Sequence, residues 1–137
     1  MAINKTAVAV LALALLGITA HAQQPMQPQT QNGIAFVSGG ISIEERQAMQ
    51  AMEGSYNLRL LFVAEPSGEY LWGVKVELMD GSGKTLLKAV SDGPYFLAKL
   101  SPGRYTVIAA DEKRAIKKSV EIAPGKAVSE RFSWPSS

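Results

Sequence analysis

The fold is decided by a stretch in which apolar and polar side chains alternate, Gly73-Val74-Lys75-Val76-Glu77-Leu78. Successive side chains of an extended strand point to opposite faces, so this alternation is typical of a strand with one face buried and the other in water. Residues 56–62 repeat the pattern. The sequence therefore predicts a half-buried strand at each of these two places.

Five further strands are predicted at regular spacing along the rest of the chain. Short segments rich in Asp, Gly, Ser and Pro separate them, and these residue types favour reversals of chain direction. The seven predicted strands span residues 56–62, 74–78, 85–91, 95–100, 104–110, 115–122 and 127–134. Short strands with short links predict an all-β fold, a seven-stranded antiparallel Greek-key β-sandwich.

A short N-terminal helix is predicted before the strands. Ser42 and Glu45 have the spacing of a capping box, and Gly54 is expected to end the helix in a left-handed conformation. The apolar residues expected on its buried face are Ile43, Ala48, Met49 and Met52. Residues 23–33 are rich in Gln and Pro and are expected to form a flexible leader, so residues 34–54 become an N-terminal extension of a domain that spans 55–137.

The first 22 residues have the pattern of a secretory signal peptide. Lys5 provides a positive start, residues 7–18 are small or apolar, and Ala20-His21-Ala22 offers the small residues that signal peptidase requires. The apolar run is shorter than the roughly 20 residues of a membrane-spanning helix, which disfavours an uncleaved anchor. We expect cleavage near Ala22, a soluble protein in the periplasm and no stable membrane insertion after cleavage.

The composition narrows the possible functions of the exported chain. The whole sequence has 14 Lys and Arg against 12 Asp and Glu, and removal of Lys5 brings the chain nearer to neutrality, which argues against nucleic acid as a partner. The only histidine, His21, leaves with the signal peptide, and the chain has no cysteine. We therefore predict a protein that is not an enzyme and that has no cofactor.

One segment resembles a phosphate-binding loop and a calcium loop, but its residues do not have the spacing that either site requires. Gly81-Ser82-Gly83-Lys84-Thr85 lacks the first glycine of a phosphate-binding loop, since Leu78 stands at that position, and no helix is predicted to follow. The segment also lacks the further acidic ligands of a calcium loop, so no metal site is predicted. The consecutive acidic pairs Glu44-Glu45 and Asp111-Glu112 are interpreted as solvated charges rather than a catalytic pair.

One family resemblance follows from the strand and turn pattern. Residues 73–78, Asp92-Gly93-Pro94-Tyr95-Phe96-Leu97 and Leu100-Ser101-Pro102-Gly103-Arg104-Tyr105-Thr106-Val107 resemble the carboxypeptidase regulatory-like domains. That family shares the transthyretin-like (prealbumin-like) sandwich, an architecture akin to the immunoglobulin fold. The resemblance covers about residues 56–134, and it implies a β-module with no active site of its own.

A structural motif is expected where two of the strands are joined. Leu100 closes one strand, Pro102 and Gly103 make the turn, and Tyr105 opens the next strand with a buried ring. A tyrosine so placed in a Greek-key sandwich returns its hydroxyl to backbone a few residues upstream, the arrangement called a tyrosine corner. Tyr105 is therefore predicted to be structural.

Three other aromatic residues are the candidate contacts for a ligand or partner: Tyr70, Trp72 and Tyr95. Tyr70 and Trp72 lie an even number of residues before Val74 and Val76. If the strand begins early, all four side chains point to the same face, which favours burial of the two aromatic rings in the core. A bulge at Gly73 would instead turn them outward as a stacking platform for sugar. Tyr95 is expected to have a more exposed ring than Tyr105.

An enzymatic function would require a cleft with perturbed carboxylates, which the sequence does not reveal. Two other functions are favoured. The first is a binding or accessory module for another periplasmic or envelope protein, through loops or through strand addition at a sheet edge. The alternative is a carbohydrate-binding module that uses the loop aromatics. The basic residues Lys113, Arg114, Lys117 and Lys118 are expected to protect an edge strand rather than to bind an anion. The oligomeric state is left open by the sequence.

Overall fold

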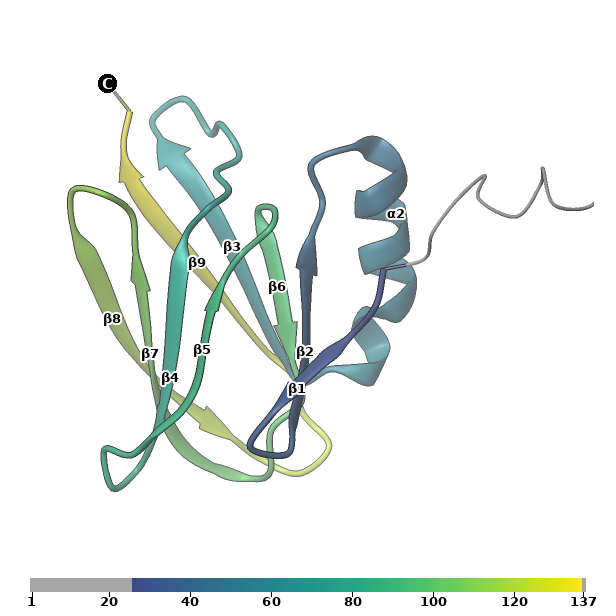
Figure 1. Ribbon diagram of the computed structural model, residues 1–137, viewed down its shortest axis with the longest axis vertical. Helices are drawn as coiled ribbons and strands as arrows, with labels where there is room; N and C mark the ends of the chain where they lie inside the picture. Colours follow the sequence, from purple (N-terminus) through teal and green to yellow (C-terminus); the bar gives the residue numbers. More distant parts are fainter. Residues whose placement is uncertain (1–25, 137) are drawn as a thin grey trace, which may run out of the picture.

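The protein is described by a computed structural model of residues 26–136, in which two β-sheets face one another (Figure 1). The five-stranded sheet has the order β1-β2-β6-β3-β9, and the four-stranded sheet has the order β5-β4-β7-β8. The strands are β1 (Gln29–Gln31), β2 (Ile34–Gly39), β3 (Leu58–Glu65), β4 (Lys75–Asp80), β5 (Thr85–Val90), β6 (Tyr95–Ala98), β7 (Gly103–Ala110), β8 (Ala115–Ile122) and β9 (Val128–Pro135). The predicted signal peptide and its cleavage site lie outside the described residues.

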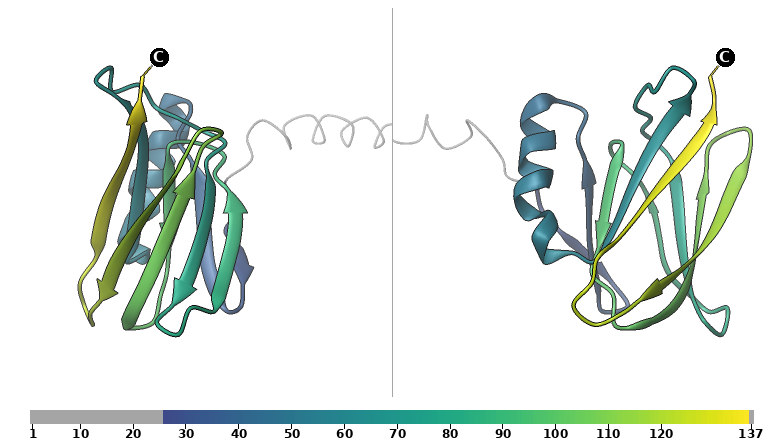
Figure 2. Two further views of the ribbon diagram at one scale, coloured as in Figure 1. Left: turned by 90° about the vertical axis from the view of Figure 1, so that its left-hand side faces the viewer. Right: turned by 180° about the vertical axis from the view of Figure 1, so that it is seen from behind.

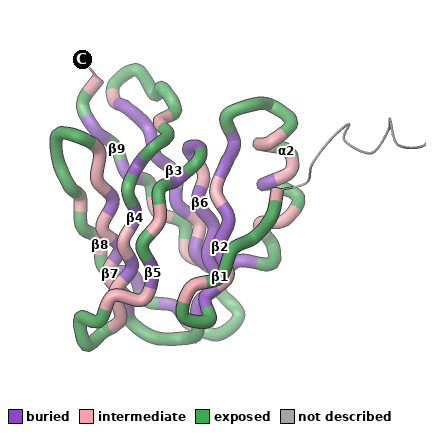
Figure 3. Tube along the Cα trace, in the orientation of Figure 1, coloured by how far each residue is buried: buried purple, intermediate pink, exposed green. Residues whose placement is uncertain are grey.

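The core fills the space between the two sheets. Buried residues recur along β3, β4 and β7, where Figure 3 marks them in purple. Phe62 and Phe132 are fully buried, and Phe36 stacks on Phe96 with ring centroids 5.6 Å apart. The alternation at residues 73–78 is confirmed, because Val74, Val76 and Leu78 are buried while Lys75 is exposed. The result is a mostly β, two-sheet fold of the predicted class.

The N-terminal segment is part of the sandwich, which corrects two predictions. The seven predicted strands correspond to β3–β9, and β1 and β2 raise the total to nine in the described part of the chain. β2 pairs with β6, so residues 34–54 are not an extension beside the domain. The flexible leader is wrong for Gln29–Gln31, which pair with β2 through a turn at Asn32 and Gly33.

One strand pair differs from the predicted antiparallel arrangement. β3 and β9 are parallel over their full lengths, from Leu58 beside Val128 to Glu65 beside Pro135. All other paired strands are antiparallel. Alternation and turn chemistry do not report which distant strand becomes the neighbour, so the sequence could not predict this pairing.

The predicted helix forms and lies on the outer side of the five-stranded sheet (Figure 2). α2 (Ile43–Met52) is capped by Ser42, whose hydroxyl accepts from the Glu45 N–H at 3.1 Å. Met49 packs with Val37, Tyr56 and Leu97 beneath the helix, whereas Ile43 is exposed and was wrongly placed on the buried face. The helix continues into a 3-10 turn, η3 (Glu53–Ser55), without the predicted left-handed glycine at Gly54. No helix among residues 26–136 is long and apolar enough to cross a membrane.

Side chains close the two open sides of the sandwich. On one side, the amide of Gln31 bonds to both backbone groups of Lys88 in β5, and Asn32 Nδ2 donates to the Leu86 carbonyl. On the other side, Lys118 Nζ donates to the Arg131 carbonyl at 2.6 Å, and Trp134 Nε1 donates to the Arg114 carbonyl at 3.1 Å. The outer edges of β5, β8 and β9 are therefore partly occupied by side chains of the same molecule.

Candidate functional site

The three candidate aromatic residues lie near one end of the sandwich. Tyr70 and Trp72 belong to the loop between β3 and β4, and Tyr95 opens β6. Trp72 is 64% exposed and Tyr70 is 39% exposed, so the interpretation that favoured core positions is wrong. We call Tyr70, Trp72 and Tyr95, together with Arg46 of α2, the aromatic cluster.

Gly73 is the reason that the aromatic side chains leave the core. It has a positive φ of 75°, a conformation that glycine adopts without steric cost, and its N–H donates to the Ser91 carbonyl at 2.8 Å. β4 accordingly begins at Lys75, and the alternation of that strand does not extend back to Trp72. The outward turn at Gly73 is the alternative that the sequence left open.

Tyr70 and Tyr95 contact one another directly. Their ring centroids are 5.9 Å apart at an interplanar angle of 57°, and their hydroxyl oxygens lie 3.4 Å apart. The guanidinium carbon of Arg46 lies 5.3 Å from the centroid of the Tyr70 ring, within the range of a cation–π contact. Trp72 forms no aromatic pair with any residue of the described range. The structure thus joins Tyr70 to Tyr95 and leaves the Trp72 ring available for contact.

Arg46 is a cluster residue that the sequence analysis missed. Its Nη1 donates to the carbonyls of Gly40 and Ile41, both at 3.0 Å, and the Glu45 carboxylate accepts from the N–H groups of the same two residues. The chain segment that enters the helix is therefore held between the two side chains. No local pattern indicates this role, because Arg46 meets Tyr70 through a contact between a helix and a loop 24 residues further along the chain.

Gly40 lets the backbone approach the Tyr95 ring. It has a positive φ of 105°, and a Cβ added there would lie 2.6 Å from Tyr95 Cδ2. Burial, followed by the hydrogen bond to Tyr70, raises the pKa of Tyr95 to about 12. The Tyr95 hydroxyl therefore keeps its proton to a higher pH than an ordinary tyrosine does, and the protonated hydroxyl can donate a hydrogen bond.

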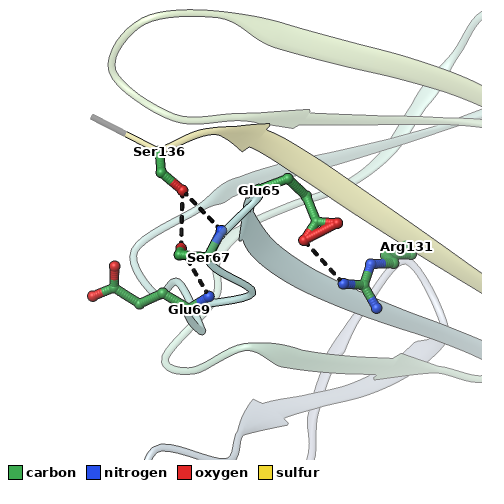
Figure 4. A network of polar contacts seen from close by, with 5 residues as sticks. All are labelled: Glu65, Ser67, Glu69, Arg131 and Ser136. Atoms are coloured by element: carbon green, nitrogen blue, oxygen red, sulfur yellow. Dashed lines mark hydrogen bonds and ion pairs between the residues drawn. The ribbon is translucent and has the colours of Figure 1, made fainter.

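A polar network fixes the base of the loop that carries Tyr70 and Trp72 (Figure 4). Ser67 Oγ lies 2.9 Å from Ser136 Oγ, and the Ser136 N–H donates to the Glu65 carbonyl at 2.7 Å. Arg131 of β9 bonds to the Glu65 carboxylate at 3.3 Å. Ser136 and β9 therefore anchor the loop, which places Tyr70 and Trp72 on a supported segment.

A hollow of about 300 Å³ lies between Tyr95 and the helix. Met49 and Leu97 provide its apolar surface, and Arg46, Gln50 and Glu53 provide polar groups. Ligand sites commonly combine an apolar surface with a few polar groups that set orientation. Arg46 and Tyr95 line this hollow and also belong to the aromatic cluster, so the two features adjoin one another.

The predicted structural motif lies away from the aromatic cluster. The Tyr105 hydroxyl donates to the Ser101 carbonyl at 2.7 Å, four residues upstream, and the ring is buried. Leu100 is buried, while Pro102 and Gly103 are exposed in the turn. The structure therefore gives Tyr105 the contact that the sequence predicted for it.

The segment that resembled a phosphate-binding loop is a hairpin turn between β4 and β5. Asp80 Oδ1 accepts from the N–H groups of Ser82 and Lys84 and from the Ser82 hydroxyl. These bonds hold the pKa of Asp80 below its ordinary value. Among residues 26–136, no three His, Cys, Asp or Glu side chains are grouped so that they could hold a metal ion.

Comparisons with known proteins assign this chain to no family. No model of a known protein family matches this chain, and a search of curated proteins finds no matching sequence.

Proposed function

We propose that this protein is an exported, non-catalytic β-sandwich module that binds another protein of the bacterial envelope, and that the aromatic cluster is its contact surface. The observation that carries the proposal is the exposure of Trp72, which follows Tyr70 by two residues in the loop, while the Tyr70 ring itself pairs with Tyr95. Trp and Tyr dominate binding hot spots, because they offer large contact areas at little cost in conformational entropy.

The cellular location and the family in this proposal are inferred from the sequence. The signal-peptide pattern of residues 1–22 supports export to the periplasm, and the Leu100-Ser101-Pro102-Gly103-Arg104-Tyr105 element supports kinship with the carboxypeptidase regulatory-like domains. The two-sheet β fold is compatible with the Greek-key, transthyretin-like path that this kinship implies.

Loop contact is a better mode of binding than strand addition for this molecule. A strand adds to a sheet through unpaired backbone groups at an edge. Gln31 and Asn32 occupy part of the β5 edge, and Lys118 and Trp134 bond to backbone at the β8 and β9 edges. The aromatic cluster has no comparable cover among the described residues.

The test is a crosslinking pull-down from periplasmic extract with wild-type protein and two variants. Trp72→Ala removes the exposed ring, and Val90→Ala is the control because Val90 is also an exposed apolar residue, 57% exposed, outside the cluster. We expect a partner that wild-type protein and Val90→Ala retain and that Trp72→Ala loses. A partner captured equally by all three proteins, or no capture above background, would count against the proposal.

Carbohydrate binding is the second candidate, and the outward position of Trp72 favours it as well. A stacking platform for sugar requires an aromatic face in solvent. The only other tryptophan, Trp134, is 2% exposed, so changes in tryptophan fluorescence report mainly on Trp72. Titration with soluble chitin and glucan oligomers should shift or quench that emission in wild-type protein but not in Trp72→Phe. Unchanged emission with every oligomer would eliminate this candidate.

A further inference from the structure

A second pocket, of about 440 Å³, lies at the opposite end of β6 from Tyr95. Three cationic side chains line it, Arg59, Lys99 and Lys126, and none of its lining residues is acidic. We call it the cationic pocket. It belongs neither to the aromatic cluster nor to the basic segment at residues 113–118.

The register of three neighbouring strands brings the three cations together. Arg59 lies on β3, next to β6 on one side and β9 on the other. Just before β3, the Asn57 N–H donates to the carbonyl of Ala98, and the residue after Ala98 is Lys99. The Asn57 carbonyl accepts from the N–H of Val128, which follows Lys126 by two residues. These two bonds hold both lysines next to the start of β3. Adjacent strands are about 4.8 Å apart, so long side chains from the two flanking segments can reach one ligand above β3.

None of the three cations of the pocket takes part in an ion pair within the part of the chain that the structure describes. The ion pairs among residues 26–136 use Arg104, Lys118 and Arg131. Arg59 Nη2 donates to the Glu53 carbonyl at 3.1 Å, but Arg59 Nε is buried and has no hydrogen-bond partner among the described residues. Buried polar groups without a partner are rare in folded proteins, and a charged one is costly. The pocket therefore concentrates positive charge in a chain that is close to neutral as a whole.

We propose that the cationic pocket binds a compact phosphate group. Two lysines supply mobile point charges and Arg59 supplies a planar donor group, and both are suited to phosphate oxygens. A single carboxylate would leave most of the positive charge unpaired, whereas a phosphate monoester or diphosphate carries charge closer to that of the pocket. The phosphate could belong to a soluble metabolite or to a phospholipid headgroup, since the recognised chemistry is the same.

The test uses pyrophosphate and inorganic phosphate as probes for the purified protein, with titration calorimetry at low ionic strength. We expect saturable binding of pyrophosphate that sodium chloride at matched ionic strength does not reproduce. Lys99→Gln and Lys126→Gln should each weaken binding about tenfold, the size expected for one charge-assisted contact. Lys84→Gln and Lys113→Gln are matched controls, because both lysines are exposed in turns outside the pocket and should leave the affinity unchanged.

A parallel arm separates the two sources of phosphate. Vesicles of phosphatidylcholine with phosphatidic acid should bind the protein if a lipid headgroup is the source, and Lys99→Gln should lose this binding. Displacement from the vesicles by pyrophosphate would show that both probes use the same pocket. Arg59→Gln is a third variant. The test depends mainly on Lys99→Gln and Lys126→Gln, because the side chains of these two lysines are exposed and contribute little to folding, whereas Arg59 is partly buried. Equal loss in the control variants, or no saturable binding of either probe, would overturn the proposal.

Discussion

The side-chain amide of Gln31 pairs with both backbone groups of Lys88, in the manner of one residue of an adjacent strand. Gln31 Nε2 donates to the Lys88 carbonyl at 2.9 Å, and Gln31 Oε1 accepts from the Lys88 N–H at 2.9 Å. The two residues belong to different sheets, because β1 is an edge of the five-stranded sheet and β5 is an edge of the four-stranded sheet. This contact links the sheets and occupies part of an edge that could otherwise pair with another chain.

Replacement of Gln31 by Ala should destabilise the protein modestly and expose the β5 edge. Two hydrogen bonds to partly solvated groups are lost, so we expect a cost of about 1 to 2 kcal/mol in denaturant unfolding. Gln29→Ala is the matched control, because Gln29 is exposed on the same strand and its side chain makes no hydrogen bond with a described residue. Light scattering during storage should rise for Gln31→Ala only. Equal stability of the two variants would show that the contact has no energetic role.

Replacement of Tyr105 by Phe should cost about 1 kcal/mol, toward the lower end of the range for a lost hydrogen bond to backbone. The ring remains, but the Ser101 carbonyl loses its donor at 2.7 Å and must bind water instead. Tyr95→Phe should cost less, because the Tyr95 hydroxyl has only a long contact with Tyr70 at 3.4 Å. Urea unfolding of both variants measures the difference. A neutral Tyr105→Phe beside a costly Tyr95→Phe would contradict the structural role of Tyr105.

Stability should fall at alkaline pH because of Tyr95. Its pKa is raised from 10.0 to about 12 by burial and then by the Tyr70 hydroxyl, so the folded state holds the phenolic proton more tightly than the unfolded state does. This contribution is fully present below pH 10 and is lost as the pH rises toward 12. The pKa of Tyr105 is also raised by burial and acts in the same direction. Unfolding free energies measured across this range should depend less steeply on pH in Tyr95→Phe. An identical pH dependence in wild type and variant would be inconsistent with the pKa of Tyr95.

Replacement of Val76 by Asp should unfold the protein, whereas Lys75→Asp should be mild. Val76 is 3% exposed, and an unpaired charge buried there costs several kcal/mol, comparable to a total stability of about 5 to 15 kcal/mol. Lys75 faces solvent on the same strand. Circular dichroism and thermal unfolding distinguish the two variants. Comparable losses would mean that the two faces of β4 are wrongly assigned.

Replacement of Lys118 by Ala should cost about 1 to 2 kcal/mol, while Lys117→Ala should be neutral. Lys118 Nζ donates to the Arg131 carbonyl, bonds to Glu130 at 3.4 Å and lies 5.0 Å from the centroid of the Phe132 ring. Lys117 points to the opposite, exposed face of the same edge strand. The sequence predicted edge protection for these lysines, and β8 is indeed an edge strand. Thermal unfolding of both variants tests whether Lys118 joins the two sheets.

Several features could be predicted from the sequence because they depend on neighbouring residues. Alternation located β3–β9 within a few residues, and the spacing of Ser42 and Glu45 located the start of the helix. The turn residues between Leu100 and Tyr105 identified a hydroxyl that bonds four residues upstream. Turns, caps and strand periodicity are local, so short segments contain the information that forms them.

The candidate site could be predicted only in part. The sequence named Tyr70, Trp72 and Tyr95, but it favoured burial for two of them, because parity alone does not reveal the positive φ of Gly73 that ends the alternation. Arg46 was missed because its contact with Tyr70 joins a helix to a loop 24 residues further along the chain. The cations of the second pocket are also separated in sequence and are grouped only by strand pairing.

The sequence by itself determined the class of fold, the positions of most strands and the list of aromatic candidates, since each follows from side-chain type and local spacing. The tertiary structure alone decided that β1 and β2 complete the five-stranded sheet, that β3 lies parallel to β9, and that Trp72 faces outward. These features depend on which distant segments become neighbours. That choice is made by the packing of the whole core and by backbone hydrogen bonds between strands, neither of which is encoded in a short stretch of sequence.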